Sequence, residues 1–275
     1  MSDLQTNKLY VNRFSILLAF LALGFSLLYL IPLESEAEAI NIFGFIFRFD
    51  FYGLFPLILA LLAGVGAYWV FSTHTRWKNE KRGVIKLLPH LALPFITTLI
   101  LAVVLGQSSR SLIWWVVFLA GYLILALLLR AEYVLIQEDG DSNLLYSVLV
   151  ISFSYGTFLI LAIALKNSDV RMFIQMILIF LAALFVTFRG MSIRQSKKIN
   201  YFQLLLVAWL IAQLGVALHY LFINPIQYGL ILTGLLYAVT SWIHFYEENK
   251  KWHQYTEPLL MIFITVVILV LSSIF

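Results

Sequence analysis

Nine long apolar runs divide the 275-residue sequence and constrain it more than any other feature. Each is close to the roughly 20 residues that an α-helix needs to cross the hydrocarbon core of a bilayer. A helix pairs its own backbone N–H and C=O groups, which find no water there. The sequence therefore predicts an all-α, polytopic transmembrane bundle of about nine spans, at 14–33, 53–74, 87–106, 111–130, 144–165, 172–188, 201–222, 226–246 and 257–275.

The composition supports this prediction. The chain is 62% hydrophobic and 12% charged, whereas soluble domains are about 45 to 50% apolar and about 25% charged. Since the spans use most of the length, we expect a single integral membrane domain over residues 1–275. The sequence has no cysteine, which excludes disulfides, thiolate metal sites and cysteine nucleophiles.

The distribution of positive charge predicts the orientation. With nine alternating spans, fourteen of the eighteen Lys and Arg residues fall on the side of the N-terminus. Lys and Arg in short loops favour the cytoplasmic side, so the sequence predicts N-in and C-out in a cytoplasmic membrane. The four exceptions are Arg48, Arg110, Lys166 and Arg171.

The first span has a second interpretation. Ala37, Glu38 and Ala39 form an A-x-A pattern of the kind that signal peptidase cleaves. The apolar core from Phe14 to Leu33 is longer than the usual 7 to 15 residues of a signal peptide. A retained anchor is therefore expected, with cleavage after Ala39 as the alternative.

Phenylalanine recurs at every second position from Phe43 to Phe51. Alternation of this kind is typical of a strand. It predicts a short extracellular ribbon in the membrane interface, or an extended lead-in to the second span. An aromatic lid for a partner or lipid is the functional alternative.

Small residues share one face of the second span. Ala60, Ala63, Gly64 and Ala67 follow the i, i+3, i+4, i+7 spacing of a helix. Such a face allows a neighbouring backbone to approach closely. We expect it to serve helix packing.

The spans lack the groups that several functions require. No Asp, Glu, Lys or Arg lies in the central part of a span, and His90, His219 and His244 lie near span ends. This argues against proton relays, voltage sensors and ion-coupled carriers. The H-E-x-x-H, G-x-S-x-G, Walker and G-x-G-x-x-G motifs are missing from the sequence. No cofactor or metal is expected.

Polar side chains nevertheless occur at membrane depth in three spans. One stripe follows the eighth span, a second cluster surrounds Tyr155 in the fifth, and Gln213 lies in the seventh. Such groups avoid lipid by facing each other or a cavity. They either hydrogen-bond between helices or form a pocket open to the cytoplasm. The stripe consists of Thr233, Tyr237, Thr240, Ser241, His244 and Glu248. The candidate pocket residues are Tyr155, Gln213, Thr233, Tyr237, Ser241, His244, Glu248, Glu132 and Arg189, with Tyr155, Gln213 and Tyr237 at the floor and His90 as a further rim residue.

Two basic loops indicate which membrane lipids the protein contacts. "TRWKNEKRGVIK" and "RGMSIRQSKK" lie on the predicted cytoplasmic side. Each Lys or Arg near an anionic leaflet contributes about 1 kcal/mol, so we expect contact with anionic membrane lipids. A protein partner or a homo-oligomer is compatible with the sequence, and nucleic acid is not implied.

Several segments carry a resemblance. "GVGAYWVFSTH", "IWWVVFLAGYLILALLLRAEYV", "LHYLF" and "GLLYAVTSW" resemble a family of uncharacterised multi-spanning bacterial membrane proteins grouped as a domain of unknown function. The likeness rests on apolar composition and on His74, Glu132, His219 with Tyr220, and the patch from Tyr237 to Ser241. It implies a bacterial cytoplasmic membrane and brings no activity with it.

Two functions fit these features. The first is a non-enzymatic membrane component that binds a lipid or small molecule, carries a solute without ion coupling, or serves as an accessory subunit. The alternative is an intramembrane enzyme acting on a lipid-type substrate from the cytoplasmic leaflet. In that case His244 and Glu248 would be acid and base, and Arg189 would bind an anion.

Overall fold

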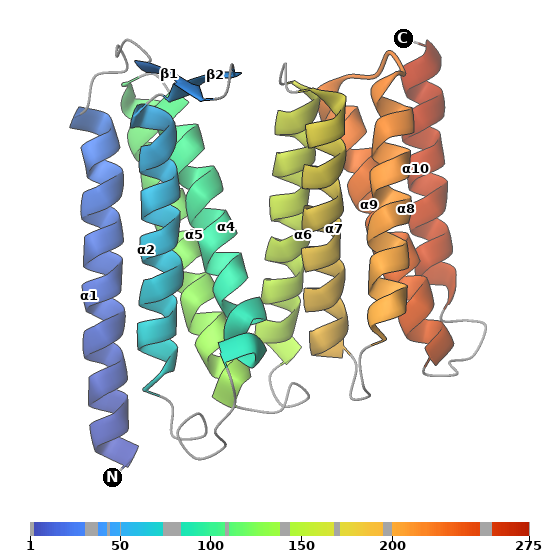
Figure 1. Ribbon diagram of the computed structural model, residues 1–275. Helices are drawn as coiled ribbons and strands as arrows, with labels where there is room; N and C mark the ends of the chain where they lie inside the picture. The colour runs from blue at the N-terminus through green and yellow to red at the C-terminus, as the bar shows by residue number, and fades with distance from the viewer. Residues whose placement is uncertain are drawn as a thin grey trace. The chain divides into compact units, whose positions relative to one another are not determined.

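The computed structural model describes residues 3–30, 38–42, 45–49, 51–73, 84–107, 110–137, 144–167, 171–194, 200–247 and 255–274. Within these ranges the chain forms helices and one pair of strands, which lies between the first two helices in the sequence (Figure 1). The elements are α1 (Asp3–Leu30), β1 (Glu38–Ile42), β2 (Phe45–Phe49), α2 (Phe51–Phe71), α4 (Val84–Gln107), α5 (Leu112–Gln137), α6 (Leu144–Lys166), α7 (Met172–Arg194), α8 (Tyr201–His219), α9 (Pro225–Glu247) and α10 (Thr256–Ile274).

Eight of the described helices are long and apolar enough to cross a membrane. The chain is therefore a multi-pass membrane protein, and the helical fold class predicted from the apolar runs is confirmed. α10 is not one of these eight, because its apolar part, Thr256–Val270, is shorter than the others. The ninth span and the N-in, C-out orientation stay predictions.

Two helices end six or seven residues beyond the predicted ends of their apolar runs. α5 ends at Gln137 instead of 130, and α7 ends at Arg194 instead of 188. Helical hydrogen bonding does not stop where the hydrocarbon stops, because polar residues also form helices in the headgroup region. As a result Glu132 and Arg189 lie inside helices, where their side chains are 0% and 1% exposed.

The phenylalanine alternation forms part of a hairpin between α1 and α2. β1 and β2 pair antiparallel, with Glu38 opposite Phe49 and Ile42 opposite Phe45. The strand predicted for this segment is thus confirmed over Phe45–Phe49. Its extracellular position in the membrane interface and its role as an aromatic lid stay predictions, and Ala37 lies outside the described residues.

The helices group into two compact units, Met1–Tyr146 and Ser147–Phe275. Each unit is described by itself below. The prediction of one domain over the whole chain stays a prediction.

Small residues bring the helices of the first unit together. Ala60, Ala63 and Ala67 on α2 are fully buried, in agreement with the predicted packing face. On the neighbouring helix α1, Leu17 Cδ1 lies 2.2 Å from where a Cβ on Gly66 would stand. Since no real Cβ approaches so closely, a glycine lets Leu17 pack against the backbone of α2.

The second unit has an apolar core built from α6, α7, α8 and α9. Its fully buried side chains include Val207, Ile211 and Leu232. Lys166, the last residue of α6, links this helix to the end of α8. Its Nζ donates to the carbonyl oxygens of His219 at 2.7 Å and Leu221 at 3.3 Å. The His219 carbonyl belongs to the last turn of α8 and the Leu221 carbonyl lies just after it, where a cation stabilises the helix dipole.

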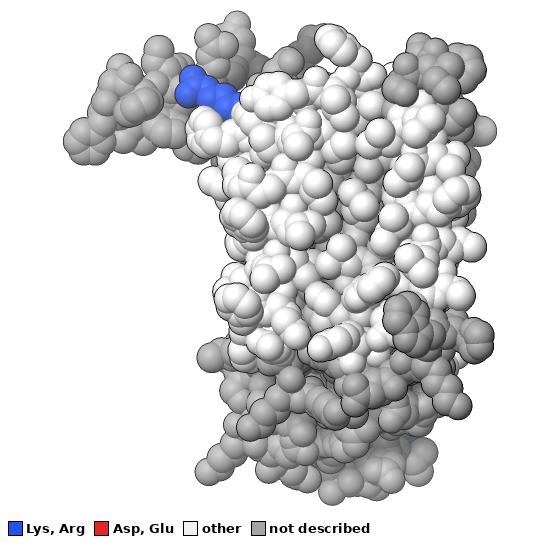
Figure 2. Space-filling model, turned by 90° about the vertical axis from the view of Figure 1, so that its right-hand side faces the viewer, with Lys and Arg blue, Asp and Glu red and all other residues white. Residues whose placement is uncertain are grey.

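The outside of the second unit is apolar. Leu260, Phe263 and Val266 of α10 are exposed. On the face shown in Figure 2, the described residues between the two ends are white, with no Asp, Glu, Lys or Arg among them. An exposed apolar surface of this kind suits hydrocarbon.

Prolines interrupt two helices of the first unit. α4 contains Pro89 and Pro94, and α2 contains Pro56. A proline inside a helix has no N–H to donate to the carbonyl four residues earlier.

Candidate functional site

A hydrogen-bonded cluster lies inside the second unit, where the polar stripe was predicted. The hydroxyl of Tyr155 on α6 lies 2.6 Å from Oγ1 of Thr240 on α9. Thr240 donates its own proton to the carbonyl of Leu236 at 2.8 Å, so the Tyr155 hydroxyl donates to Thr240. Both side chains are buried. The cluster therefore joins α6 to α9 at membrane depth.

Tyr237 extends this cluster towards α10. Its ring packs edge-on against Tyr155, with centroids 5.3 Å apart. Its hydroxyl donates to Oε1 of Glu257, an exposed carboxylate in the first turn of α10. Sequence reasoning missed Glu257, although a carboxylate that opens an apolar run is a visible signal. Tyr155, Thr240, Tyr237 and Glu257 are called the tyrosine cluster below.

The remaining stripe residues lie around the tyrosine cluster on α9. Ser241 is fully buried, and Thr233 and His244 are half-buried. Glu248 lies outside the described residues. On α7, a Cβ at Gly190 would lie 3.9 Å from the hydroxyl oxygen of Tyr155, so α7 passes close to the cluster next to the buried Arg189.

Gln213 does not belong to this group, contrary to the predicted floor of the pocket. Its side chain is exposed on α8. The buried face of α8 includes Val207, Ala208, Ile211 and Ala212. One residue beyond Ala212 is a turn of about 100°, which carries Gln213 out of the core.

Glu132 and His90 belong to the first unit, whereas the tyrosine cluster belongs to the second. Oε2 of Glu132 on α5 accepts a hydrogen bond from Nδ1 of His90 on α4, at 2.7 Å. Glu132 is fully buried and His90 is 19% exposed. This hydrogen bond links α4 to α5. Because its predicted members are divided between two units, the pocket as a whole stays a prediction.

Replacement of Tyr155 by phenylalanine tests the tyrosine cluster. The change removes the hydroxyl that Thr240 accepts from, and we expect a loss of about 1 kcal/mol in the free energy of unfolding. Tyr237→Phe should cost less, because its partner Glu257 is exposed and can bind water instead. Thermal unfolding in mild detergent measures both, and equal stability of Tyr155→Phe and the original chain would contradict the prediction.

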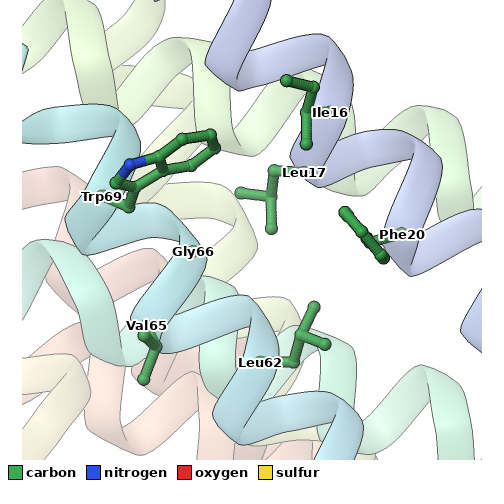
Figure 3. A pocket seen from close by; sticks show the side chains of 7 residues that line it. All are labelled: Ile16, Leu17, Phe20, Leu62, Val65, Gly66 and Trp69. Atoms are coloured by element: carbon green, nitrogen blue, oxygen red, sulfur yellow. The ribbon is translucent and has the colours of Figure 1, made fainter.

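An apolar groove lies between α1 and α2 in the first unit (Figure 3). Its volume is about 340 Å³. The side chains of both helices that line it are apolar apart from the indole N–H of Trp69. They belong to Ile16, Leu17, Phe20, Leu62, Val65, Gly66 and Trp69.

Arg13 stands next to one end of this groove, one helical turn before Ile16. Its Nη1 donates to the carbonyl oxygen of Trp69 at 2.8 Å and to Oγ of Ser72 at 3.2 Å. Its guanidinium carbon lies 4.9 Å from the centre of the Trp69 ring. Arginine has five N–H donors, and those on Nε and Nη2 make no hydrogen bond to the described residues. The apolar groove thus has beside it a cation whose Nε and Nη2 donors are available to a ligand.

The tyrosine cluster consists of hydroxyls, one carboxylate and no described histidine. Among the residues that the structure describes, no three His, Cys, Asp or Glu side chains are grouped so that they could hold a metal ion. The acid and base of the enzyme hypothesis, His244 and Glu248, cannot be paired because Glu248 is not among the described residues.

Comparisons with known proteins give one match. Searches of curated proteins and of solved structures found none. A family model described as "Protein of unknown function (DUF5656)" matches residues 34–272. This confirms the resemblance to an uncharacterised family, while a bacterial origin stays an expectation. Since the match covers most of the 275 residues, the chain belongs to the DUF5656 family.

Proposed function

We propose that the protein is a non-enzymatic membrane component that binds a phospholipid in the groove between α1 and α2. One observation supports this proposal above all: the apolar groove is adjoined at one end by Arg13. An acyl chain fits the apolar lining, and a phosphate fits the spare guanidinium donors. On the predicted orientation, Arg13 lies at the cytoplasmic leaflet, where anionic lipids gather.

The depth of Arg13 and Trp69 agrees with a lipid bound in this way. Trp69 lies near the end of the span Leu54–Phe71, and Arg13 lies near the start of the span Lys8–Leu30. Tryptophan prefers the level of the headgroups. The groove extends from there towards the membrane centre, as an acyl chain does. A carrier or an accessory subunit could use the same site.

Two substitutions test the proposal, with the lipid that copurifies in mild detergent as the readout. Val65→Trp places a large ring in the groove and should remove most of the retained phospholipid, whereas Val116→Trp on the exposed side of α5 should not. Both valines are exposed, so neither change disturbs the core.

The charge of the bound lipid is tested separately. Arg13→Gln should lower the preference for anionic over zwitterionic phospholipid about fivefold, since one arginine contributes about 1 kcal/mol. The control is Arg110→Gln, because Arg110 is exposed and its guanidinium lies over Tyr29, near the other end of α1. Retention of the same lipids by Val65→Trp and Arg13→Gln would overturn the proposal.

A further inference from the structure

The outer face of α8 carries an amide where hydrocarbon is expected. Gln213 lies within the span Tyr201–His219, away from both of its ends. Its side chain is exposed and makes no hydrogen bond to the described residues. Lipid chains offer neither a donor nor an acceptor, so an amide there is strongly unfavourable until something covers it.

The residues around Gln213 form a regular seam. Starting at Phe202, outward-facing positions recur with spacings of four and three residues. All members are exposed except Val216, which is half-buried. The α8 seam consists of Phe202, Leu206, Trp209, Gln213, Val216 and Tyr220. The five spacings average 3.6 residues, so the seam follows one side of the helix, and the alternation of four and three is the pattern by which two helices pack along each other.

We propose that the α8 seam is the interface between two copies of this chain. Copies inserted in the same orientation and related by a two-fold axis along the membrane normal bring identical residues to the same depth. Gln213 of one copy then meets Gln213 of the other. A glutamine side chain has both an NH₂ donor and a C=O acceptor, so the two amides satisfy each other.

The position of Gln213 in the seam supports a second copy over lipid. A single polar residue at a core position of paired helices fixes their register and number. The seam holds one such residue between Trp209 and Val216. The small and exposed Ala217 follows one turn later and leaves room for the partner helix to approach.

Disulfide trapping in native membranes tests the interface, because the chain has no cysteine of its own. Leu206→Cys places a thiol in the seam, and oxidation should give a covalent dimer. The matched control is Leu260→Cys on α10. Both leucines are exposed, and Leu206 lies five residues after the start of α8 and Leu260 four residues after the start of α10.

The role of the amide is tested in the Leu206→Cys chain. Gln213→Met keeps the length of the side chain and removes the amide. The dissociation constant of the dimer should therefore rise about 5- to 30-fold. Gln213→Asn keeps an amide and should lie between the two. Since Gln213 is exposed, the thermal unfolding of the monomer should not change with either substitution.

Three results would overturn the proposal. The first is equal dimer formation by Leu206→Cys and Leu260→Cys, which indicates random collision. The second is unchanged dimer formation after Gln213→Met, which leaves the amide without a role. The third is crosslinking of Leu206→Cys to a different protein, which assigns the seam to another partner.

Discussion

Replacement of His90 by leucine should lower the free energy of unfolding by about 3 kcal/mol. The substitution removes the Nδ1–H that Glu132 accepts at 2.7 Å. Glu132 is fully buried, so its carboxylate loses a partner that water cannot replace. Removal of one member of a buried pair is costly for this reason. Unfolding by denaturant in mixed micelles measures the loss.

A double-mutant cycle separates the pair from other effects. His90→Leu, Glu132→Gln and the double variant should give a coupling energy of about 1 kcal/mol or more. Thr97→Val is the control on the same helix, because the Thr97 hydroxyl bonds only the carbonyl of Leu93 one turn earlier among the described residues. A coupling energy near zero would contradict the role given to this pair.

Replacement of Gly229 by leucine should destabilise the second unit by about 3 kcal/mol. A Cβ at Gly229 would stand 2.6 Å from Cγ1 of Ile163 and 3.2 Å from the carbonyl oxygen of Leu159. A side chain can turn away, but the backbone of α6 can move only if the two helices separate. The expected result is a lower melting temperature in mild detergent.

Gly156 provides the matched control for this substitution. Apart from its chain neighbours and the backbone of its own helix, no described atom lies within 4 Å of where its Cβ would stand. Gly156→Ala should therefore raise the free energy of unfolding by about 0.5 to 1 kcal/mol, because alanine favours the helix. Gly229→Ala should lower it. If the two alanine variants were equally stable, the close approach of α9 and α6 would not matter.

The sequence predicted the helices well because apolar length decides which segments can cross a membrane. It did not predict the two units, and the reason is physical. In a bilayer the lipid is as apolar as the interior of the bundle, so an apolar side chain does not reveal which of the two it faces. Helix partners depend instead on details such as Gly66 against Leu17.

The same ambiguity explains what was found and missed in the candidate site. The stripe on α9 was visible because several hydroxyls share one face, and Thr240 indeed meets Tyr155. Several polar residues are needed to identify one face of a helix. The single amide of Gln213 therefore did not reveal that it lies outside the core. Arg13 was counted only towards orientation, and the groove beside it had no signal because its lining resembles any lipid-facing surface.

The prolines of α4 give the contact between His90 and Glu132 a further meaning. Pro94 leaves the carbonyl of His90 without its helical N–H donor, and Pro89 does the same to Ile85. The first third of α4 is therefore a weakened segment of backbone, able to swing about these points. Its imidazole is fastened to a buried carboxylate on α5. The hydrogen bond to Glu132 therefore joins this weakened part of α4 to α5, and its loss in His90→Leu removes one of the contacts that hold the segment in place.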